Sequence, residues 1–220
     1  LTLVFGLMDL LTFGHGAFIS IGAFIATSVM LPFGDWLRAD SLWQNLAVML
    51  PAVLAAMAVS AAIGYGFERI IIRPVYGQHL KQILITIGGL IVTEQLIDAI
   101  WGPDQIPLPR PASFRGSIVF GDVAIERYRL LAVVVGLAIF IAMHLVLNRT
   151  RIGLLIRAGV ENREMVEALG YRIRRLFVGV FVAGSALAGL GGAMWALYQE
   201  TVTAAMGMQV MVLIFIVVII

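Results

Sequence analysis

The chain has 220 residues, of which 61% are hydrophobic and only 13% charged, with a formal net charge of +2. Globular domains in water have roughly 45–50% apolar and about 25% charged residues, so this composition excludes a water-soluble globule, a disordered chain and a nucleic-acid-binding domain. The sequence has no cysteine and only three scattered histidines, which excludes disulfides and the usual spacing of a metal site. Lipid is therefore the expected surrounding of most of the chain.

Five apolar runs are long enough to cross a bilayer as helices. Such a helix needs about 20 mostly apolar residues, and continuous rather than alternating hydrophobicity argues against a β-barrel. In chain order the runs are Ala17–Met30 extended back through Leu10–Gly16, Leu46–Phe67, Gln82–Trp101, Leu130–Leu147 and Leu176–Leu197, with partial runs at Leu1–Met8 and Met208–Ile220. We predict an all-α, polytopic transmembrane helix bundle, a single domain over residues 1–220 truncated at both ends.

A polar interruption lies in the first run, where Gly14 and Gly16 flank His15 and Asp9 precedes them. Two glycines around a histidine favour a broken helix, and irregular backbone at membrane depth is tolerated where it is buried or lines a cavity. Ionisable residues in a span usually mark a pathway. Asp9, Gly14, His15 and Gly16 are therefore candidates for a translocation path, and the alternative is a plain loop at the cytoplasmic interface.

The third run carries two carboxylates, Glu94 and Asp98, at i and i+4 on one helical face. Glu94 lies deep enough to need a partner or a water-filled cavity, and Thr86 and Gly88 make the same run polar and kinkable. Thr86, Gly88 and Glu94 are also path candidates. The alternative is a structural role, in which Glu94 pairs with a neighbouring helix.

The distribution of basic residues predicts the orientation. Residues 148–175 hold seven of the fifteen Lys and Arg, so this loop is predicted to be cytoplasmic, as is Glu68–Lys81. The segments Leu31–Asn45, Gly102–Arg129 and Tyr198–Gly207 are then external. The proline-rich segment 102–129 is too polar for a span and is expected to form an external loop.

A short helix is predicted within the cytoplasmic loop. Asn162 is a plausible N-cap, Glu164 places negative charge in the first turn, and Gly170 stops the helix. The helix is too short to cross a membrane, and one face is apolar. That face carries Met165, Val166 and Leu169, whereas Arg163, Glu164 and Glu167 lie around the other side. The partner of this face is the lipid surface or a protein, and the mixed charges favour a protein.

Small residues recur every four positions in the last complete run. Gly184, Ala188 and Gly192 form one row, and Ser185, Gly189 and Ala193 form the next. Rows of this kind let neighbouring helices approach closely in a membrane. We expect Gly184, Ser185, Ala188, Gly189 and Gly192 to be helix-packing positions.

Several segments, in the expected order along the whole chain, resemble the permeases of branched-chain amino acid ABC transporters of the Liv type. They are Phe13–Phe18 with Gly22-Ala23, Arg73–Gly88, Ile100–Asp104, Glu161–Gly170, Arg172–Phe177 and Gly184–Ala193. The chain is most similar to the Liv H type, and the paralogous Liv M type has comparable patterns. The resemblance implies an inner-membrane importer subunit rather than an enzyme.

The resemblance also implies partners. They are a second permease subunit of the Liv M type or a second copy of this chain, two cytoplasmic ATPase subunits, a periplasmic substrate-binding protein and the lipid bilayer. The chain itself would bind no cofactor and no nucleic acid, and the ATPase would use ATP and Mg. No Walker A, G-x-S-x-G or H-E-x-x-H pattern occurs in the sequence, which agrees with ATP hydrolysis on another chain.

By this resemblance the short cytoplasmic helix is the coupling helix that enters a groove of the ATPase. It comprises Asn162, Arg163, Glu164, Met165, Val166, Glu167, Ala168, Leu169 and Gly170. The family loop begins E-A-A with a glycine a few residues later, so Glu167–Gly170 departs from it in spacing. Related permeases move branched-chain or other amino acids, urea or short amides. A channel or secondary carrier that works without ATP is the other alternative.

Overall fold

Among residues 13–75, 78–120 and 123–219, which this computed structural model describes, five helices are long and apolar enough to cross a membrane. They are α2 (Gly14–Met30), α4 (Leu42–Phe67), α5 (His79–Trp101), α6 (Arg127–Arg149) and α9 (Ile173–Gln199). The predicted all-α polytopic bundle is confirmed. Four of the helices begin before the predicted apolar runs, because the polar residues at the run ends continue the helix beyond the apolar segment.

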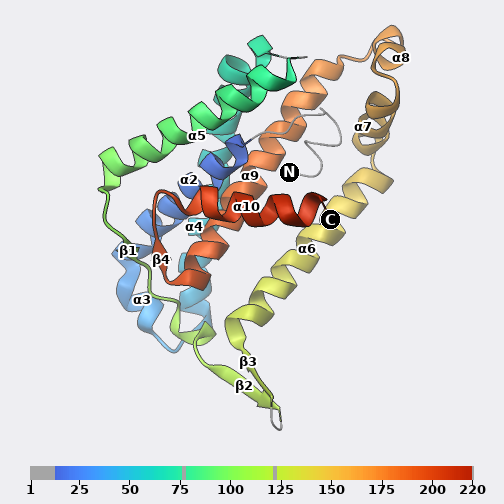
Figure 1. Cartoon of the computed structure of the whole chain (residues 1–220). Coiled ribbons are helices and arrows are strands. Elements are labelled where there is room, and N and C mark those ends of the chain that lie inside the picture. The colour runs from blue at the N-terminus through green and yellow to red at the C-terminus, as the bar shows by residue number, and fades with distance from the viewer. Residues whose placement is uncertain (1–12, 76–77, 121–122, 220) are drawn as a thin grey trace.

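Shorter elements connect these spans. They are η1 (Leu31–Phe33), α3 (Gly34–Arg38), η2 (Glu68–Ile72), η3 (Arg73–Val75), η4 (Ala112–Phe114), α7 (Arg151–Glu161), α8 (Arg163–Ala168) and α10 (Met206–Ile219). Strand β1 (Ile106–Pro107) pairs antiparallel with β4 (Thr201–Val202), and β2 (Ser117–Phe120) pairs with β3 (Val123–Glu126). These strands lie at one end of the bundle (Figure 1).

The centre of the bundle is a tight contact among α2, α4 and α9. A Cβ atom on Gly22 would collide with the backbone of Gly189, and one on Gly189 would collide with Ser60. A Cβ on Gly192 would collide with the carbonyl oxygen of Ile19. Backbones this close require glycine, and the contact fixes the three helices relative to one another.

The small residues of α9 serve two different surfaces. Ser185, Gly189 and Gly192 are buried in the contact with α2 and α4, and a Cβ on Gly64 of α4 would collide with the Ser185 hydroxyl. Gly184 and Ala188 instead line a groove on another side of α9. The five predicted packing positions therefore separate into a packed row and a groove-lining row.

Two apolar clusters mark the ends of the bundle. One cluster includes Leu37, Leu108, Tyr128 and Val202, and so joins the three segments predicted to be external. The other joins Ile72 to the residues of α7, α8 and α9 that continue the predicted cytoplasmic loop, Ile156, Val166 and Ile173. These groups lie at opposite ends of the molecule (Figure 1). We call them the outer end and the inner end, after the orientation predicted from the charges.

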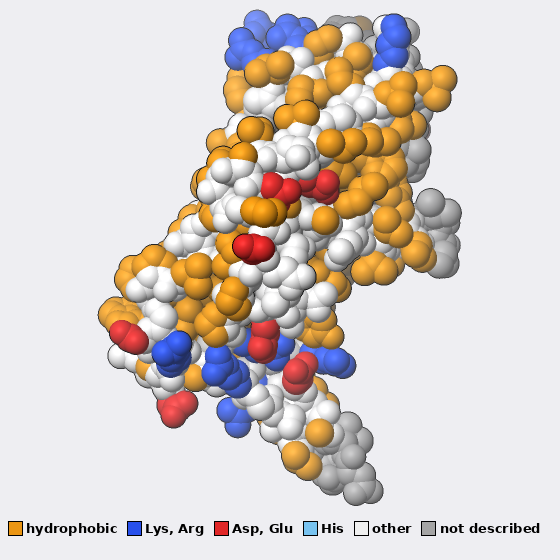
Figure 2. Space-filling model, turned by 60° about the vertical axis from the view of Figure 1, so that its left-hand side comes forward, with side chains coloured by type: hydrophobic (Ala, Val, Ile, Leu, Met, Phe, Trp, Pro, Cys, Tyr) orange, Lys and Arg blue, Asp and Glu red, His pale blue; other side chains and the backbone are white. Residues whose placement is uncertain are grey.

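The lateral surface between the two ends is largely apolar. Leu84, Leu96 and Ile100 of α5 and Val133 and Phe140 of α6 are all more than half exposed. Figure 2 shows Lys and Arg side chains gathered at the two ends of one face, with hydrophobic side chains and a few carboxylates between them. This distribution fits a molecule whose middle lies in hydrocarbon and whose ends lie in water.

Helix α10 begins inside the bundle rather than at its outer end. Helix α9 ends at Gln199, and the chain then descends so that the N–H of Gly207 donates to the Ser20 hydroxyl at 2.9 Å. Ser20 lies ten residues before the end of α2 at Met30, about 15 Å along the helix axis. The sequence predicted an external loop over Tyr198–Gly207. Its first residues, Gln199–Thr201, are exposed at the outer end, whereas its last two, Met206 and Gly207, are buried within the bundle, where irregular backbone is tolerated.

Candidate functional site

The predicted short helix of the cytoplasmic loop is present as α8. The side chain of Asn162 caps it by accepting the N–H of Met165 at 2.9 Å, and Gly170 ends it with a φ of +87°. Both boundaries are confirmed. Sequence reasoning did not identify α7, which precedes α8 and is capped by the hydroxyl of Thr150.

The apolar face of α8 is divided between two directions. Val166 is 4% exposed and packs in the inner cluster with Ile173 and Phe177. Met165 and Leu169 are 57% and 70% exposed, and Glu167, Ala168 and Gly170 are exposed beside them. Arg163 begins the helix and Glu164 follows it. One apolar residue therefore anchors the helix to the bundle, while two remain available for a partner.

The Gly14–Gly16 segment is the first turn of α2, so its three residues are helical and the irregular backbone expected there is not found. His15 is 2% exposed, and its ring lies edge-on to Phe18 and Phe181 with centroids 5.9 and 5.4 Å away. A Cβ on Gly16 would lie 3.1 Å from the carbonyl oxygen of Gly207. Asp9 lies outside the described residues.

The path candidates of α5 do not share one surface. Thr86 is buried and donates to the carbonyl oxygen of Gln82 at 2.8 Å, within its own helix. Gly88 is exposed, and a Cβ there would meet nothing within 4 Å. Glu94 lies between Leu90 and Ile97, which pack towards α2, and its Oε1 is buried without a hydrogen-bond partner among the described residues.

The structure therefore places the candidates on three surfaces. Gly16 belongs to the α2–α5 contact, where a Cβ on it would also lie 3.3 Å from Cδ1 of Leu90, and Glu94 follows Leu90 by about one turn of α5. His15 lines the groove on the α9 side of α2. Gly88 faces away from both. The predicted set is not brought together into a single cavity by the described residues.

The groove has a volume of about 960 Å³ and lies between α6 and the rest of the bundle. Most of the residues that line it are apolar, and they come from α2, α6, α7, α9 and α10. Met143 of α6 and Gly179 of α9 lie on opposite walls. Helix α6 stands apart from α9 along this groove (Figure 1).

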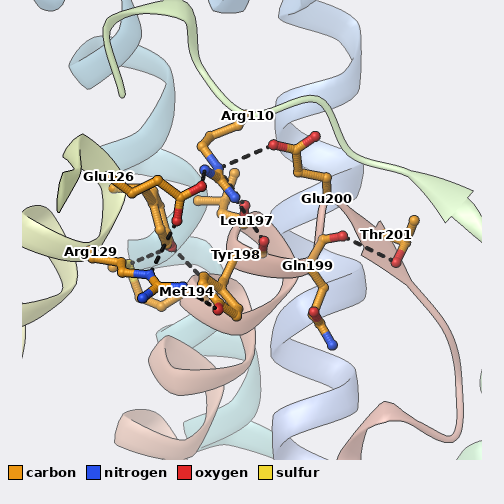
Figure 3. Close-up of polar contacts among 10 residues, drawn as sticks. Arg110, Glu126, Arg129, Met194, Leu197, Tyr198, Gln199, Glu200 and Thr201 are labelled. Carbon is orange, nitrogen blue, oxygen red and sulfur yellow. Dashed lines mark hydrogen bonds and ion pairs between the residues drawn. The ribbon is translucent and has the colours of Figure 1, made fainter. Parts of the chain in front are cut away.

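A polar cluster at the outer end was not anticipated from the sequence (Figure 3). The guanidinium of Arg110 donates to the carbonyl oxygens of Leu197 and Tyr198, at 3.2 and 2.8 Å, where α9 ends. It also forms ion pairs with Glu126 at 3.1 Å and Glu200 at 3.3 Å. Arg110 is only 6% exposed, so a single charged side chain ties the segment before α6 to the end of α9.

Aromatic rings complete this cluster. The Arg110 guanidinium lies 4.9 Å from the ring centroid of Tyr128, and the Tyr128 hydroxyl donates to the carbonyl oxygen of Met194 at 2.6 Å. The hydrogen bond from Arg110, together with the charges of Arg110 and Arg129, lowers the pKa of Glu126, so this carboxylate stays ionised at neutral pH. No local signal marks these contacts, because Arg110 and Leu197 are 87 residues apart.

The apolar helices and polar ends define a multi-pass membrane protein. All of residues 1–220 match the family described as "Branched-chain amino acid transport system / permease component". The chain is 28% identical over 215 residues to "High-affinity branched-chain amino acid transport system permease protein BraD" of Pseudomonas aeruginosa, covering 94% of this chain and 67% of that protein. It is 23% identical over 212 residues to the LivH protein of Escherichia coli, with the same coverage. No solved structure matches the chain.

A more distant relative, the probable LivH protein of Methanocaldococcus jannaschii, is 21% identical over 209 residues, which are 93% of this chain and 62% of that protein. The chain belongs to the family of branched-chain amino acid transport permease components. The resemblance drawn from the motifs is thereby confirmed, and the chain is a transport permease component.

Proposed function

We propose that the chain is the membrane-spanning subunit of an ATP-driven importer for branched-chain amino acids, located in the inner membrane of a bacterium. The family match over all 220 residues carries this proposal. The names of the relatives from Pseudomonas aeruginosa and Escherichia coli refer to high-affinity branched-chain amino acid transport. High affinity fits delivery of the substrate by a periplasmic binding protein at the outer end.

The inner end supports a role for separate ATPase subunits. Helix α8 is short, is anchored through Val166 and exposes Met165 and Leu169, which suits insertion into a groove of another protein. A channel or an ion-coupled carrier does not need such a helix. Two ATPase subunits, using ATP and Mg, would act on two permease subunits. The second permease would be a Liv M-type chain or another copy of this one.

The translocation path is proposed to follow the α2–α5 contact. Glu94 is a carboxylate at membrane depth with a buried oxygen, and such groups usually mark a pathway. An amino acid carries an ammonium group that complements this charge. Gly16 lies on the α2 side of this contact, where a Cβ would lie 3.3 Å from Cδ1 of Leu90 in α5.

Reconstitution in proteoliposomes with the partner chains tests this function. We expect the binding protein to stimulate ATP hydrolysis and labelled leucine to accumulate, whereas urea and a short amide do not. A complex with an inactive ATPase is the control. Accumulation of urea or the amide instead would assign the chain to those substrates, and uptake that persists with the inactive ATPase would contradict an ATP-driven importer.

A further inference from the structure

Helix α6 is held at its two ends and has little contact between them. Tyr128 at its outer end is 1% exposed, and the other described side chains of the helix are partly or fully exposed. Its inner half faces α9 across the groove of about 960 Å³. A segment with so few buried contacts can change its tilt at low energetic cost.

The joint between α6 and α7 is stiff. A single residue, Thr150, separates the two helices, and its hydroxyl donates to the carbonyl oxygen of Val146 in α6 at 2.6 Å. The hydroxyl oxygen of Thr150 also accepts the N–H of Gly153 in α7 at 3.2 Å. One hydroxyl thus bonds both helices, so a displacement of α7 is passed to α6 instead of being absorbed at the joint.

Close packing reinforces this joint. A Cβ on Gly153 would collide with the carbonyl oxygen of Leu147, so α7 lies directly against the last turn of α6. Arg157 of α7 also donates to the side-chain oxygen of Asn148 at 3.4 Å. The angle between the two helices is therefore set by backbone contact as well as by the Thr150 hydroxyl.

The outer end of α6 is fixed in a different way. Arg110 forms ion pairs with Glu126, the residue before α6, and bonds the last carbonyls of α9. The Tyr128 hydroxyl bonds Met194 of α9. These contacts are all close to the first residues of α6. They therefore allow α6 to tilt about its outer end while they prevent that end from separating from α9.

We propose that α6 and α7 form one lever, which pivots at the Arg110 cluster and carries movement of the α7–α8 segment into the membrane. This inference rests on the proposed function, in which an ATPase moves α8. Swinging of the lever widens and narrows the groove between α6 and α9. Thr150 is the positioning residue of the joint, and Arg110 is that of the pivot.

The lever predicts unequal movement along α6. Met143 lies 15 residues from Tyr128, about 22 Å along the axis, so each tilt of about 10° displaces it by about 4 Å. Leu131 lies three residues from Tyr128 and moves by less than about 1 Å in the same tilt. Because the chain has no cysteine, cysteine pairs can be introduced without background reaction.

The test uses the full permease assembled with its partners and two cysteine pairs. In the inner pair, Met143→Cys with Gly179→Cys, a cleavable thiol cross-link should abolish uptake, and cleavage should restore it. In the outer pair, Leu131→Cys with Met194→Cys, the same link should leave uptake within twofold of the unlinked protein. The lever is wrong if the inner link is harmless or if the outer link is equally damaging.

Spin labels on the same pairs separate the lever from the transport function. Addition of ATP should change the Met143–Gly179 distance and leave the Leu131–Met194 distance unchanged. Leucine uptake without a change in the inner distance keeps the proposed function and overturns the lever. A change in the inner distance in a complex that moves no amino acid keeps the lever and overturns the function.

The joint is tested by Thr150→Val, which keeps the shape of the side chain and removes its hydroxyl. It should lower the number of substrate molecules moved per ATP hydrolysed by about fivefold or more, as expected for the loss of two hydrogen bonds. Thr150→Ser should restore the ratio. Equal ratios for all three proteins at equal protein levels would refute the role of Thr150.

Discussion

Ser20 connects two segments that are 187 residues apart. Its hydroxyl donates to the carbonyl oxygen of Ala204 and accepts the N–H of Gly207, so one buried side chain satisfies both groups where α10 begins. Thr27 is equally buried, but its hydroxyl donates to the carbonyl oxygen of Ala23 in its own helix. The Ser20 hydroxyl therefore links two helices and the Thr27 hydroxyl does not, although both are buried hydroxyls of α2.

Ser20→Ala should destabilise the protein by about 1–3 kcal/mol, because a buried N–H and a buried carbonyl lose their partner. Thr27→Val is the matched control and should cost less than about 1 kcal/mol, since the Ala23 carbonyl stays within its helix. Thermal unfolding in detergent measures both. Equal losses of stability would show that the start of α10 does not depend on Ser20.

Glu94 gives the second prediction at the residue scale. Glu94→Gln keeps the size of the side chain and removes its charge, and we expect leucine uptake to fall about tenfold or more, since hydrogen bonds to charged groups contribute about 1.5–3 kcal/mol. Asp104→Asn makes the same chemical change in the exposed outer segment and should leave uptake unchanged. Normal leucine uptake by the Glu94→Gln variant would show that Glu94 is not part of the translocation path.

At the scale of elements, the apolar runs and the capping residues predicted the spans and α8, because both signals are local. Asn162 and Gly170 are close neighbours in the chain, and their effect on backbone geometry does not depend on the rest of the fold. Three other features depend on which helices pack against each other. They are the Arg110 cluster, the position of the start of α10 inside the bundle, and the division of the small residues of α9 between two surfaces. A single sequence does not indicate these contacts between helices that are distant in the chain.

The contact among α2, α4 and α9 can be tested with one bulky side chain. Gly189→Leu should sharply lower the amount of folded protein, because overpacking a fitted contact costs typically 1–3 kcal/mol and here the collision is with Ser60 and the Ala56 backbone. Val178→Leu adds volume at a partly exposed position of the same helix and should be tolerated. Membrane protein levels and uptake measure the difference, and equal values would contradict the close contact.

The exposed face of α8 gives the second prediction for an element. Replacing Met165 and Leu169 with serine should abolish binding-protein-stimulated ATP hydrolysis while leaving the protein folded, because both side chains are exposed and Val166 still anchors the helix. Val119→Ser changes a residue that is 66% exposed at the outer end and is the control. Retained stimulation in the double variant would show that the ATPase binds elsewhere.

At the scale of the whole molecule, the two ends are built differently around the same membrane-spanning middle. The inner end holds α7 and α8 through apolar contacts such as Val166 with Phe177. The outer end adds the ion pairs of Arg110 to the apolar contacts between α6 and α9, and the side chains of Glu126 and Glu200 are 39% and 50% exposed. A change of pH in the acidic range should therefore affect the outer attachment of α6 before the apolar attachment at the inner end.

Glu126 determines the direction of this pH dependence. Its pKa lies below the ordinary value of 4.5, so its contribution to stability is complete above about pH 4.5 and is lost as the pH falls through the lower pKa of the folded protein. The difference in unfolding temperature between the wild type and Glu126→Gln should therefore be constant from pH 7 to about pH 5 and shrink below it. In an Arg110→Gln background, which lacks the main partner, the same comparison should show a much smaller difference at every pH. A difference that grows on acidification, or that is undiminished without Arg110, would contradict the ion pair as the attachment of α6.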